Sequence, residues 1–399
     1  MSNFDKLKER ADNVLCQTYA RYPIAVKSAK GGRLYDFDGN EYLDLLAGLA
    51  VMSLGHCHPE VARVVSEQTH KLWHVSNLFY QEEQVALAEK LVATSHCKRV
   101  FFCNSGAEAN EALFKISRRY QQKIKHKDAH EVISFSGCFH GRTMSTLAVG
   151  PEKYREGFLP MPVGFTQIVR GDLAALEKAI TPATAAVIME IVQGEGGIYP
   201  MDPEFAKGVQ ALCRKNGVLF LVDEVQTGMG RSGKWWAFQR YGLEPDAFSL
   251  AKAVAGGLPM GAMLCSDELA KAFDFGSHGT TFGGNPICAA AGCKVMEIME
   301  RDKLPQRAGE MGKWALERFA RIQADLPGAI KEVRGLGLLL GIDLTFPGKP
   351  IWEALLKKGF VLNLTQDTVL RLLPPLNIER ADLEAFAVAL EEVLRAHQA

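Results

Sequence analysis

The sequence lacks the features that mark several large classes of protein. No apolar run in its 399 residues approaches the roughly 20 residues that a membrane-spanning helix needs. Lysine and arginine total 46, and aspartate and glutamate also total 46. This zero net charge gives no indication of nucleic acid or an acidic membrane surface as a partner. We therefore expect a protein that binds neither nucleic acid nor membrane.

Cysteine is present but forms none of the patterns that indicate a disulfide framework or a zinc finger. The chain has nine cysteines, an odd number, and no C-x-x-C pair. This pattern favours free thiols in a reducing cytoplasm. Cys57 lies between His56 and His58, so a metal site there is one interpretation, but no second ligand pair stands at finger spacing. We favour a turn before Pro59 and expect no metal site.

The sequence does contain a regular alternation of strand and helix patterns, with 47% hydrophobic and 23% charged residues. Between about residues 85 and 300, helical patterns such as GAEANEALFKISRRYQQK separate short apolar segments. These segments are RVFFCNS, EVISFSG, AAVIMEIV, GVLFLVDEV, AFSLAK and GAMLCS. Strands that are apolar along their whole length are typical of a sheet buried on both faces. The alternation therefore predicts an α/β domain with a mostly parallel sheet.

The two ends of the chain have different patterns. Near the N-terminus, one helical stretch precedes GGRLYDFDGNEYLD, whose Asp-Gly step predicts a hairpin turn. Near the C-terminus, KEVRGLGLLLGIDL and TVLRLLPPL predict strands, whereas PIWEALLKKG and ADLEAFAVALEEVLRAH predict amphipathic helices. We predict an N-terminal arm and hairpin over residues 1–45, a large domain over 46–305 and a smaller α+β domain over 306–399.

Two glycine-rich segments are candidates for phosphate binding. GMGRSG, residues 228–233, fits the pattern G-x-G-x-x-G, and with the next lysine it nearly forms a P-loop. DEVQT separates it from the preceding strand, and Trp235 stands where a P-loop has Ser or Thr, so a plain glycine-rich loop is favoured. FFCNSGAEANEAL is better placed, because a strand ends at Ser105, which can cap a helix that begins near Gly106. An ordinary N-cap and a phosphate site both remain open there.

Lys252 ends an apolar run in FSLAKAVAGGLPMGAM, where burial of an ammonium group is costly. Asp223 and Glu224 end the apolar strand LFLVDEV, and ligands bind at such strand ends in open α/β sheets. One interpretation is a buried ion pair between Asp223 and Lys252. The other is a lysine that condenses with the aldehyde of pyridoxal 5′-phosphate (PLP), while Asp223 pairs with the protonated ring nitrogen.

Ten motifs follow one another along nearly the whole chain. They are GGRLYDFDGNEYLDLLAGLAVMSLGHCHPEV, SNLFY, NSGAEANEAL, FHGRT, VQGEGG, DEVQTGMGRSG, LAKAVAGGLPMGA, HGTTFGGNP, RGLGLLLGIDL and LRLLPPL. In this order they resemble the class III (subgroup II, omega-type) aminotransferases of PLP fold type I. The resemblance implies a large PLP-binding domain with a mostly parallel, seven-stranded sheet, a smaller C-terminal α+β domain, and a homodimer with shared active sites.

The same resemblance assigns cofactor roles. Lys252 matches the lysine that binds PLP covalently, and Asp223 matches the partner of the ring nitrogen, so these two are the expected catalytic residues. Phe139 matches the aromatic residue stacked on the ring, and Gln226 the residue near the ring hydroxyl. Thr281 matches a threonine that reaches the phosphate from the other subunit. The remaining expected cofactor-binding residues are Ser105, Gly106 and Ala107 in the phosphate loop, and Glu224 and Val225 beside Asp223.

Substrate-binding roles follow from the resemblance as well. Arg371 matches the arginine that holds the α-carboxylate of the 2-oxo acid, and Glu195 a glutamate that pairs with this arginine. A static salt bridge is the alternative for this pair. Arg142 matches an arginine that binds a substrate carboxylate, and Thr280 a substrate-contacting position. Arginine suits these roles because its guanidinium group binds carboxylates in a bidentate manner.

Within the family, the compact length, SNLFY and VQGEGGIYPMDPEF are most similar to enzymes that act on acetylated ornithine. The resemblance implies ping-pong transamination of N2-acetylornithine with 2-oxoglutarate, giving N-acetylglutamate 5-semialdehyde and glutamate, a step of arginine biosynthesis. N-Succinyl-diaminopimelate is a further candidate substrate. The alternatives are transamination of ornithine, succinylornithine or 4-aminobutyrate on the same scaffold, and a PLP-binding protein without catalytic activity.

Two features depart from the family pattern. Ile191 follows Glu190 where relatives usually have proline, and we expect this to alter local backbone stiffness but not the chemistry. Trp235 and Trp236 stand where relatives vary. These tryptophans either shape the pocket or pack against a neighbouring helix, and packing is favoured.

Overall fold

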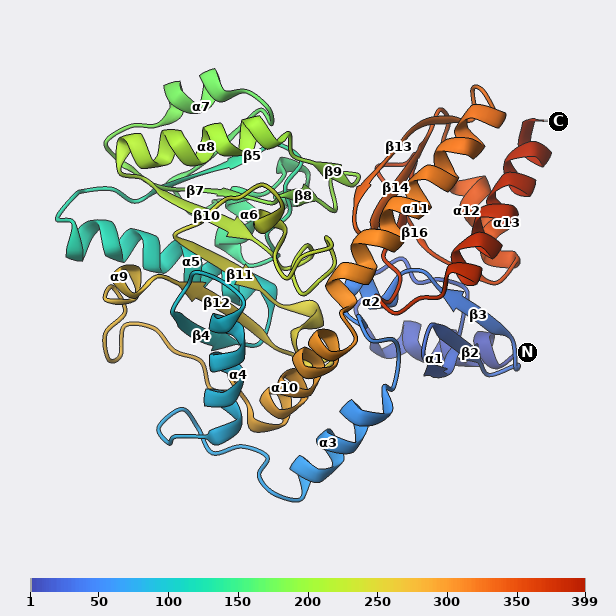
Figure 1. Ribbon diagram of the computed structural model, residues 1–399, viewed down its shortest axis with the longest axis horizontal. Helices are drawn as coiled ribbons and strands as arrows, with labels where there is room; N and C mark the ends of the chain where they lie inside the picture. The colour runs from blue at the N-terminus through green and yellow to red at the C-terminus, as the bar shows by residue number, and fades with distance from the viewer. Residues whose placement is uncertain (1, 399) are drawn as a thin grey trace.

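A seven-stranded sheet forms the centre of the larger part of the molecule in the computed structural model, which describes residues 2–398 (Figure 1). The strands lie in the order β4-β12-β11-β10-β7-β5-β6. β12 runs antiparallel to both of its neighbours, and the other adjacent strands are parallel. The mostly parallel sheet is therefore confirmed. Its strands are β4 (Arg99–Cys103), β5 (Glu131–Phe135), β6 (Phe165–Ile168), β7 (Thr184–Met189), β10 (Leu219–Asp223), β11 (Ala247–Leu250) and β12 (Gly261–Cys265).

Alternate side chains of the central strands pack into two different cores, as the pleat of a strand requires. In β10, Leu219 and Leu221 pack with helix α5, whereas Phe220 and Val222 pack with helix α8. Helices thus cover both faces of the sheet, which explains why β7, β10 and β11 are buried at every position. These two helices are α5 (Gly106–Arg119) and α8 (Pro203–Asn216).

The C-terminal part of the chain contains a second, antiparallel sheet with the strand order β13-β14-β17-β16. Helix α11 packs on β13 and on α13, and α13 also packs on α12 (Figure 1). The smaller α+β unit expected from the sequence is present. Its elements are α11 (Leu304–Asp325), β13 (Ile330–Leu336), β14 (Leu339–Leu344), α12 (Lys349–Lys357), β16 (Asn363–Thr365), β17 (Val369–Leu372) and α13 (Arg380–Gln398).

The N-terminal hairpin joins the C-terminal part through backbone hydrogen bonds. Its strands pair in the order β1-β2-β3, and β3 then pairs in parallel with the short strand β15, which places Leu43 opposite Phe360. Sequence patterns gave no indication of this pairing, and the domain boundaries near residues 45 and 305 stay predictions. The elements of this region are α1 (Asn3–Val14), β1 (Val26–Lys30), β2 (Arg33–Asp36), β3 (Glu41–Asp44) and β15 (Phe360–Val361).

The turn expected before Pro59 is confirmed. Cys57 has a φ of 51°, His56 Nε2 lies 2.7 Å from Asp44 Oδ2, and Pro59 opens helix α3. Residues 2–398 contain no group of three or more His, Cys, Asp or Glu side chains that would hold a metal ion, and all nine cysteines are free thiols.

The remaining helices and short strands lie around the two sheets (Figure 1). They are α2 (Ala47–Ala50), α3 (Pro59–Thr69), α4 (Glu82–Ala93), α6 (Met144–Val149), α7 (Leu173–Ala179), β8 (Val192–Gln193), β9 (Tyr199–Pro200), α9 (Asp267–Ala270) and α10 (Pro286–Arg301). None of the helices in the described part of the chain is both long enough and apolar enough to cross a membrane.

Candidate active site

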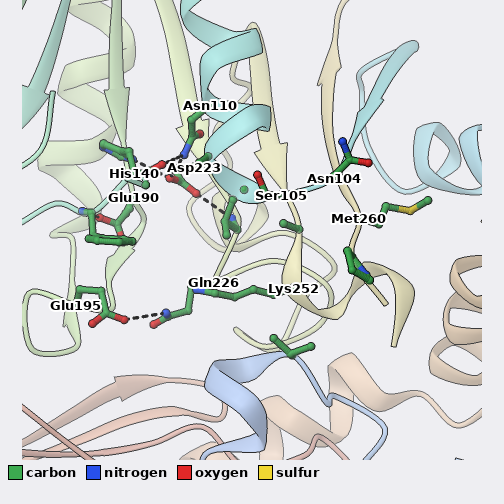
Figure 2. A pocket seen from close by; sticks show the side chains of 18 of the residues that line it. Asn104, Ser105, Asn110, His140, Glu190, Glu195, Asp223, Gln226, Lys252 and Met260 are labelled. Atoms are coloured by element: carbon green, nitrogen blue, oxygen red, sulfur yellow. Dashed lines mark hydrogen bonds and ion pairs between the residues drawn. The ribbon is translucent and has the colours of Figure 1, made fainter. Parts of the chain in front are cut away.

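A cavity of about 360 Å³ opens at the carboxyl ends of the central strands, where Asp223 ends β10 and Lys252 follows β11 (Figure 2). Open α/β sheets bind ligands in this position. The residues assigned from the sequence that line the cavity are Ser105, Gly106, Ala107, Phe139, Glu195, Asp223, Val225, Gln226 and Lys252. Segments far apart in the sequence thus meet at one place, as the resemblance implied.

Asp223 is buried and held by three donors from different segments. Its Oδ2 accepts a hydrogen bond of 2.8 Å from Asn110 Nδ2 and lies 2.7 Å from His140 Nδ1, and its Oδ1 accepts 2.9 Å from the Val225 N–H. Ser249 Oγ in turn donates to Asn110 Oδ1 at 2.7 Å. Such a set of donors supplies the hydrogen bonds that a buried carboxylate needs and holds it in one orientation.

His140 is the cationic partner that a buried carboxylate requires. Burial alone would lower the pKa of His140, but the Cys138 sulfur and the Asp223 carboxylate outweigh it and raise this pKa well above its usual range. Neither Asn110 nor His140 was assigned from the sequence. Both lie inside motifs that were recognised, NSGAEANEAL and FHGRT, and their position beside assigned residues was the available signal.

Lys252 lies two residues after the end of β11 with a left-handed φ of 47°, and its side chain lines the cavity. Burial lowers the pKa of Lys252; Arg371 lowers it further, whereas Glu195 and Asp223 partly oppose the shift. A lowered pKa increases the share of neutral, nucleophilic amine. Lys252 forms no salt bridge with Asp223 or any other residue in the described range 2–398. The interpretation of the two residues as a buried ion pair is therefore wrong.

The start of helix α5 forms another wall of the cavity. Ser105 Oγ accepts a hydrogen bond of 3.2 Å from the Glu108 N–H, so Ser105 is the N-cap of this helix. A Cβ at Gly106 would lie 2.7 Å from a methyl group of Val225, so only glycine fits here without displacement. The first N–H groups of this helix face a cavity at the positive end of its dipole, an arrangement that attracts an anionic group.

Arg371 and Glu195 form an ion pair next to the cavity. Arg371 is 2% exposed, and its Nη1 donates to Glu195 Oε1 at 2.5 Å. Burial opposes ionisation of Glu195, but Arg371 prevails and lowers the pKa of this carboxyl group. Gln226 Nε2 donates to the same oxygen at 3.5 Å, as Figure 2 shows. Glu195 lines the cavity and Arg371 does not, so the glutamate stands between the arginine and the ligand space.

The structure does not bring the side chain of Glu224 into the cavity. Its carboxylate accepts hydrogen bonds of 2.6 Å from Thr227 Oγ1 and 2.9 Å from the Phe238 N–H, and it is 1% exposed. Burial raises the pKa of Glu224 to about 7. The side chain therefore supports the glycine-rich loop rather than a ligand.

Three other assigned residues lie outside the cavity. Thr280 Oγ1 accepts a hydrogen bond of 3.0 Å from Asn104 Nδ2, and Asn104 itself lines the cavity, which places Thr280 at its rim. Thr281 is exposed. Arg142 is also exposed, and its guanidinium carbon lies 4.0 Å from the centre of the Tyr154 ring.

The structure shows where the two departures from the family pattern lie. Glu190 lines the cavity and accepts a hydrogen bond of 2.8 Å from the Phe139 N–H, and burial raises its pKa. Ile191, next to it, is fully buried. Trp236 is fully buried, and its ring centre lies 4.7 Å from that of Phe248, so this tryptophan packs in the core as favoured from the sequence.

The segment GMGRSG is a buried loop, as favoured from the sequence. Arg231 in this loop is 1% exposed and donates to the carbonyl oxygens of Leu338 and Pro374 in the C-terminal part. Burial lowers the pKa of Arg231 to about 9. This arginine connects the two parts of the molecule, and the segment does not line the cavity.

Comparison with known proteins agrees with this geometry. The family Aminotransferase class-III matches residues 15–394. The chain is 46% identical over 378 residues to the acetylornithine aminotransferase of Methanocaldococcus jannaschii, which covers 94% of this chain and 95% of that protein. It is 45% identical over 385 residues to the acetylornithine aminotransferase of Myxococcus xanthus, with 96% of each chain covered.

Solved structures share the whole fold. The ornithine aminotransferase of Toxoplasma gondii ME49 superimposes with a TM-score of 0.95 at 30% identity, over 100% of this chain and 96% of that one. The acetylornithine aminotransferase of Elizabethkingia anophelis superimposes with a TM-score of 0.89 at 28% identity, over 99% of this chain and 100% of that one. The chain belongs to the class III aminotransferase family and is an aminotransferase.

Proposed function

We propose that this aminotransferase uses PLP to transfer the distal amino group of N2-acetylornithine to 2-oxoglutarate, giving N-acetylglutamate 5-semialdehyde and glutamate. Relatives named acetylornithine aminotransferase, at 40–46% identity over nearly the whole chain, support this substrate. The observation that carries the proposal is the Glu195–Arg371 pair beside Lys252, because it offers a carboxylate-binding group that can be neutralised.

The residues around the cavity fit PLP. A buried carboxylate fixed by three donors suits a protonated pyridine nitrogen, and the free N–H groups at the start of α5 suit a phosphate. Phe139 lines the same cavity as a flat apolar surface, and Lys252 supplies an amine whose pKa is lowered. When bound, PLP supplies an electron sink for the negative charge that develops at the reacting carbon.

The chain's own groups then have separate tasks. Lys252 Nζ holds the cofactor and moves a proton at the substrate carbon, because it lines the cavity and its pKa is lowered. Asp223 keeps a fixed negative charge on the side of the cavity formed by the large domain, where it would pair with the pyridine nitrogen. Acetylornithine reacts at its distal amine, so it enters while Glu195 neutralises Arg371. For 2-oxoglutarate, the Glu195 side chain moves away and Arg371 binds the α-carboxylate.

Arg142 and Thr280 are proposed to contact the substrate at the rim of the cavity. The guanidinium group of Arg142 is exposed and held against the rings of Tyr154 and Phe139, so it is free to bind a carboxylate. Thr280 is tied to the cavity-lining Asn104.

We also propose a homodimer in which Thr281 completes the phosphate site of the other copy. Asn77 Nδ2 donates to the carbonyl oxygens of Thr280 and Gly283, so the SNLFY segment and the loop of Thr281 form one surface. Large apolar side chains are exposed on these two segments, and such a patch favours a protein partner. They are Leu78, Phe79, Tyr80 and Phe282.

Mixed dimers test the shared site. Chains with Lys252→Ala should be inactive alone, and chains with Thr281→Ala should retain PLP less well, by about 1.5–3 kcal/mol for a lost hydrogen bond to a charged acceptor. A dimer of one chain of each kind should contain one intact site and recover activity. Absence of activity in verified mixed dimers would contradict the shared site.

A panel of amine donors tests the substrate. The purified enzyme is loaded with PLP and given 2-oxoglutarate with acetylornithine, succinylornithine, N-succinyl-diaminopimelate, ornithine or 4-aminobutyrate. We expect the largest kcat/KM for acetylornithine, with the other acylated amines next. A larger kcat/KM for ornithine or 4-aminobutyrate would replace the proposed activity with one of these.

A further inference from the structure

The hairpin of β16 and β17 carries the arginine of the ion pair and a second residue that contacts it. Asn363 on β16 lies directly opposite Arg371 on β17 in the strand register. Asn363 Oδ1 accepts hydrogen bonds from Arg371 Nε at 3.0 Å and from Nη2 at 2.7 Å. The guanidinium group is therefore held along its Nε–Nη2 edge by the amide and reaches Glu195 through Nη1.

This amide has a fixed orientation. Arginine has only donors, so the oxygen of Asn363 must face it. The Nδ2 of Asn363 lies 3.4 Å from the hydroxyl oxygen of Tyr22, and this hydroxyl donates to the Leu362 carbonyl oxygen at 2.9 Å. Tyr22 packs edge-on against Trp352, with ring centres 4.9 Å apart. The support of Arg371 thus extends to the segment before the N-terminal hairpin.

The same hairpin holds the backbone of Glu195. The carbonyl oxygen of Glu195 accepts hydrogen bonds of 3.1 Å from Thr365 Oγ1 and 2.6 Å from Gln366 Nε2. Because the backbone of Glu195 is held in this way, only the Glu195 side chain has to move when a substrate carboxylate replaces it beside Arg371. Arg371 stays in place, because Asn363 binds its Nε and Nη2 atoms, whereas Glu195 binds Nη1.

The neutral charge of the Asn363 side chain is as important as its geometry. Glu195 is the one carboxylate within salt-bridge distance of Arg371 among residues 2–398. An aspartate at position 363 would accept the same two hydrogen bonds in a bidentate pair and would cancel the charge permanently. A neutral amide orients the guanidinium group and leaves its charge available to Glu195 or to a substrate.

We propose that Asn363 is a specificity-determining positioning residue, which orients Arg371 without neutralising it and so preserves binding of the 2-oxo acid carboxylate. This proposal rests on the proposed function of the Glu195–Arg371 pair. It assigns a different consequence to each half-reaction. The acetylornithine half-reaction uses an arginine that is already neutralised, whereas the 2-oxoglutarate half-reaction requires its charge.

The test compares N363D and N363A with the wild type, all loaded with PLP. Calorimetry measures the binding of glutarate, a dicarboxylate that has no carbonyl to react, and single-turnover kinetics measure each half-reaction. In N363D we expect glutarate binding and kcat/KM for 2-oxoglutarate to fall by at least about tenfold, because the arginine charge is cancelled. The acetylornithine half-reaction should stay within about threefold of wild type, a change no larger than the contribution of one exposed ion pair.

N363A separates charge from orientation, since it removes the acceptor but leaves the charge of Arg371. We expect glutarate affinity to rank wild type first, N363A second and N363D last. Asn377→Asp is the matched control, because Asn377 is exposed, donates to the Leu54 carbonyl oxygen and makes no contact with Arg371. This control should bind glutarate as the wild type does.

Three results would overturn the proposal: N363D that binds glutarate as tightly as the wild type, equal losses in N363A and N363D, or equal losses in both half-reactions of N363D. If N363D does not fold, as judged by thermal unfolding, glutarate affinity in N363A decides, and a value equal to wild type overturns the proposal. A wild type that does not transfer the amino group of acetylornithine would instead refute the proposed function, while the glutarate ranking still decides the role of Asn363.

Discussion

Two carboxylates that line the same cavity as Lys252 are held in different ways. The side chain of Asp223 is 4% exposed and is fixed by donors from α5, the FHGRT segment and its own turn. The side chain of Glu195 is 30% exposed and has one strong partner, Arg371, which comes from the smaller C-terminal sheet. The first is a permanent charge inside the large sheet, and the second is, in the proposed function, a charge that a substrate replaces.

This difference matches the two demands of a transaminase. The cofactor stays in the site through both half-reactions, so the charge next to it has to be constant. Two unlike substrates alternate in the same cavity, so the charge next to them has to change between the half-reactions. Fixed and exchangeable charges are separated by placing one in the core of the sheet and the other at the contact between the two parts of the chain.

Lys252→Ala should have the largest effect, because it removes the amine that lines the cavity together with the two carboxylates. In the proposed function, the variant loses both the amine that would hold the cofactor and the group that would move the proton. We expect kcat to fall by more than about 10⁴-fold, the upper end of what a general acid–base group contributes. The measurement is steady-state turnover of acetylornithine with 2-oxoglutarate, and measurable activity near that of wild type would remove Lys252 from the mechanism.

Asp223→Asn should impair both half-reactions to a similar degree, as expected for a permanent charge. Loss of one preorganised electrostatic group typically lowers kcat by roughly 10²–10³-fold. The single amide oxygen still accepts a hydrogen bond either from the Val225 N–H or from Asn110, and the side chain keeps its size, so the fold should persist, which thermal unfolding checks. A loss confined to one half-reaction in single-turnover kinetics would show that Asp223 acts on a substrate and not on the cofactor.

The buried strands and the fixed charge were the parts most accessible from the sequence. β7, β10 and β11 are buried at every position, so each gives a continuous apolar run that ends in a loop. A charged residue directly after such a run, as Asp223 and Lys252 are, is conspicuous and has few explanations. Edge strand β6 was not predicted, because its four residues are only partly buried and alternate weakly.

Contacts that depend on tertiary packing were not predictable in the same way. Asn110 is a polar residue within a helix, and nothing local shows that it faces Asp223 rather than solvent. The pairing of β15 with β3 joins Phe360 and Val361 to a strand that is distant from them in the sequence. The assignment of Glu224 as a cofactor-binding residue, in contrast, could have been avoided from the sequence. Side chains alternate along a strand, so adjacent Asp223 and Glu224 point to opposite faces of the sheet.

Arg371→Ala should separate the two half-reactions and so sharpen the contrast. Removing one member of a buried charged pair costs on the order of 2–5 kcal/mol. This corresponds to a roughly thirty-fold to several-thousand-fold fall in kcat/KM for 2-oxoglutarate. Acetylornithine should suffer less, because it enters while Glu195 neutralises the arginine. PLP retention serves as the control, and equal losses for both substrates would refute the division of roles.

Glu195→Gln should have the smallest effect and the most selective one. The variant leaves Arg371 charged and without its carboxylate partner, which is unfavourable for an amine substrate and harmless for a 2-oxo acid. The carboxylate is partly exposed, so we expect a loss of about 1 kcal/mol, or roughly fivefold in kcat/KM, for acetylornithine. The 2-oxoglutarate half-reaction should be unchanged or faster, because no carboxylate has to be displaced.

The stability of the same variant gives a second measurement that does not depend on turnover. Arg371 lowers the pKa of Glu195 although burial opposes this, so ionised Glu195 stabilises the fold above the usual range of a glutamate pKa. This contribution is lost as the pH falls through the lowered pKa. The Tm of Glu195→Gln should therefore lie below that of wild type near neutral pH, and the difference should shrink in acid. A Tm difference that stays constant across this pH range would show that ionisation of Glu195 does not contribute to stability. Glu195 would then be a static structural residue.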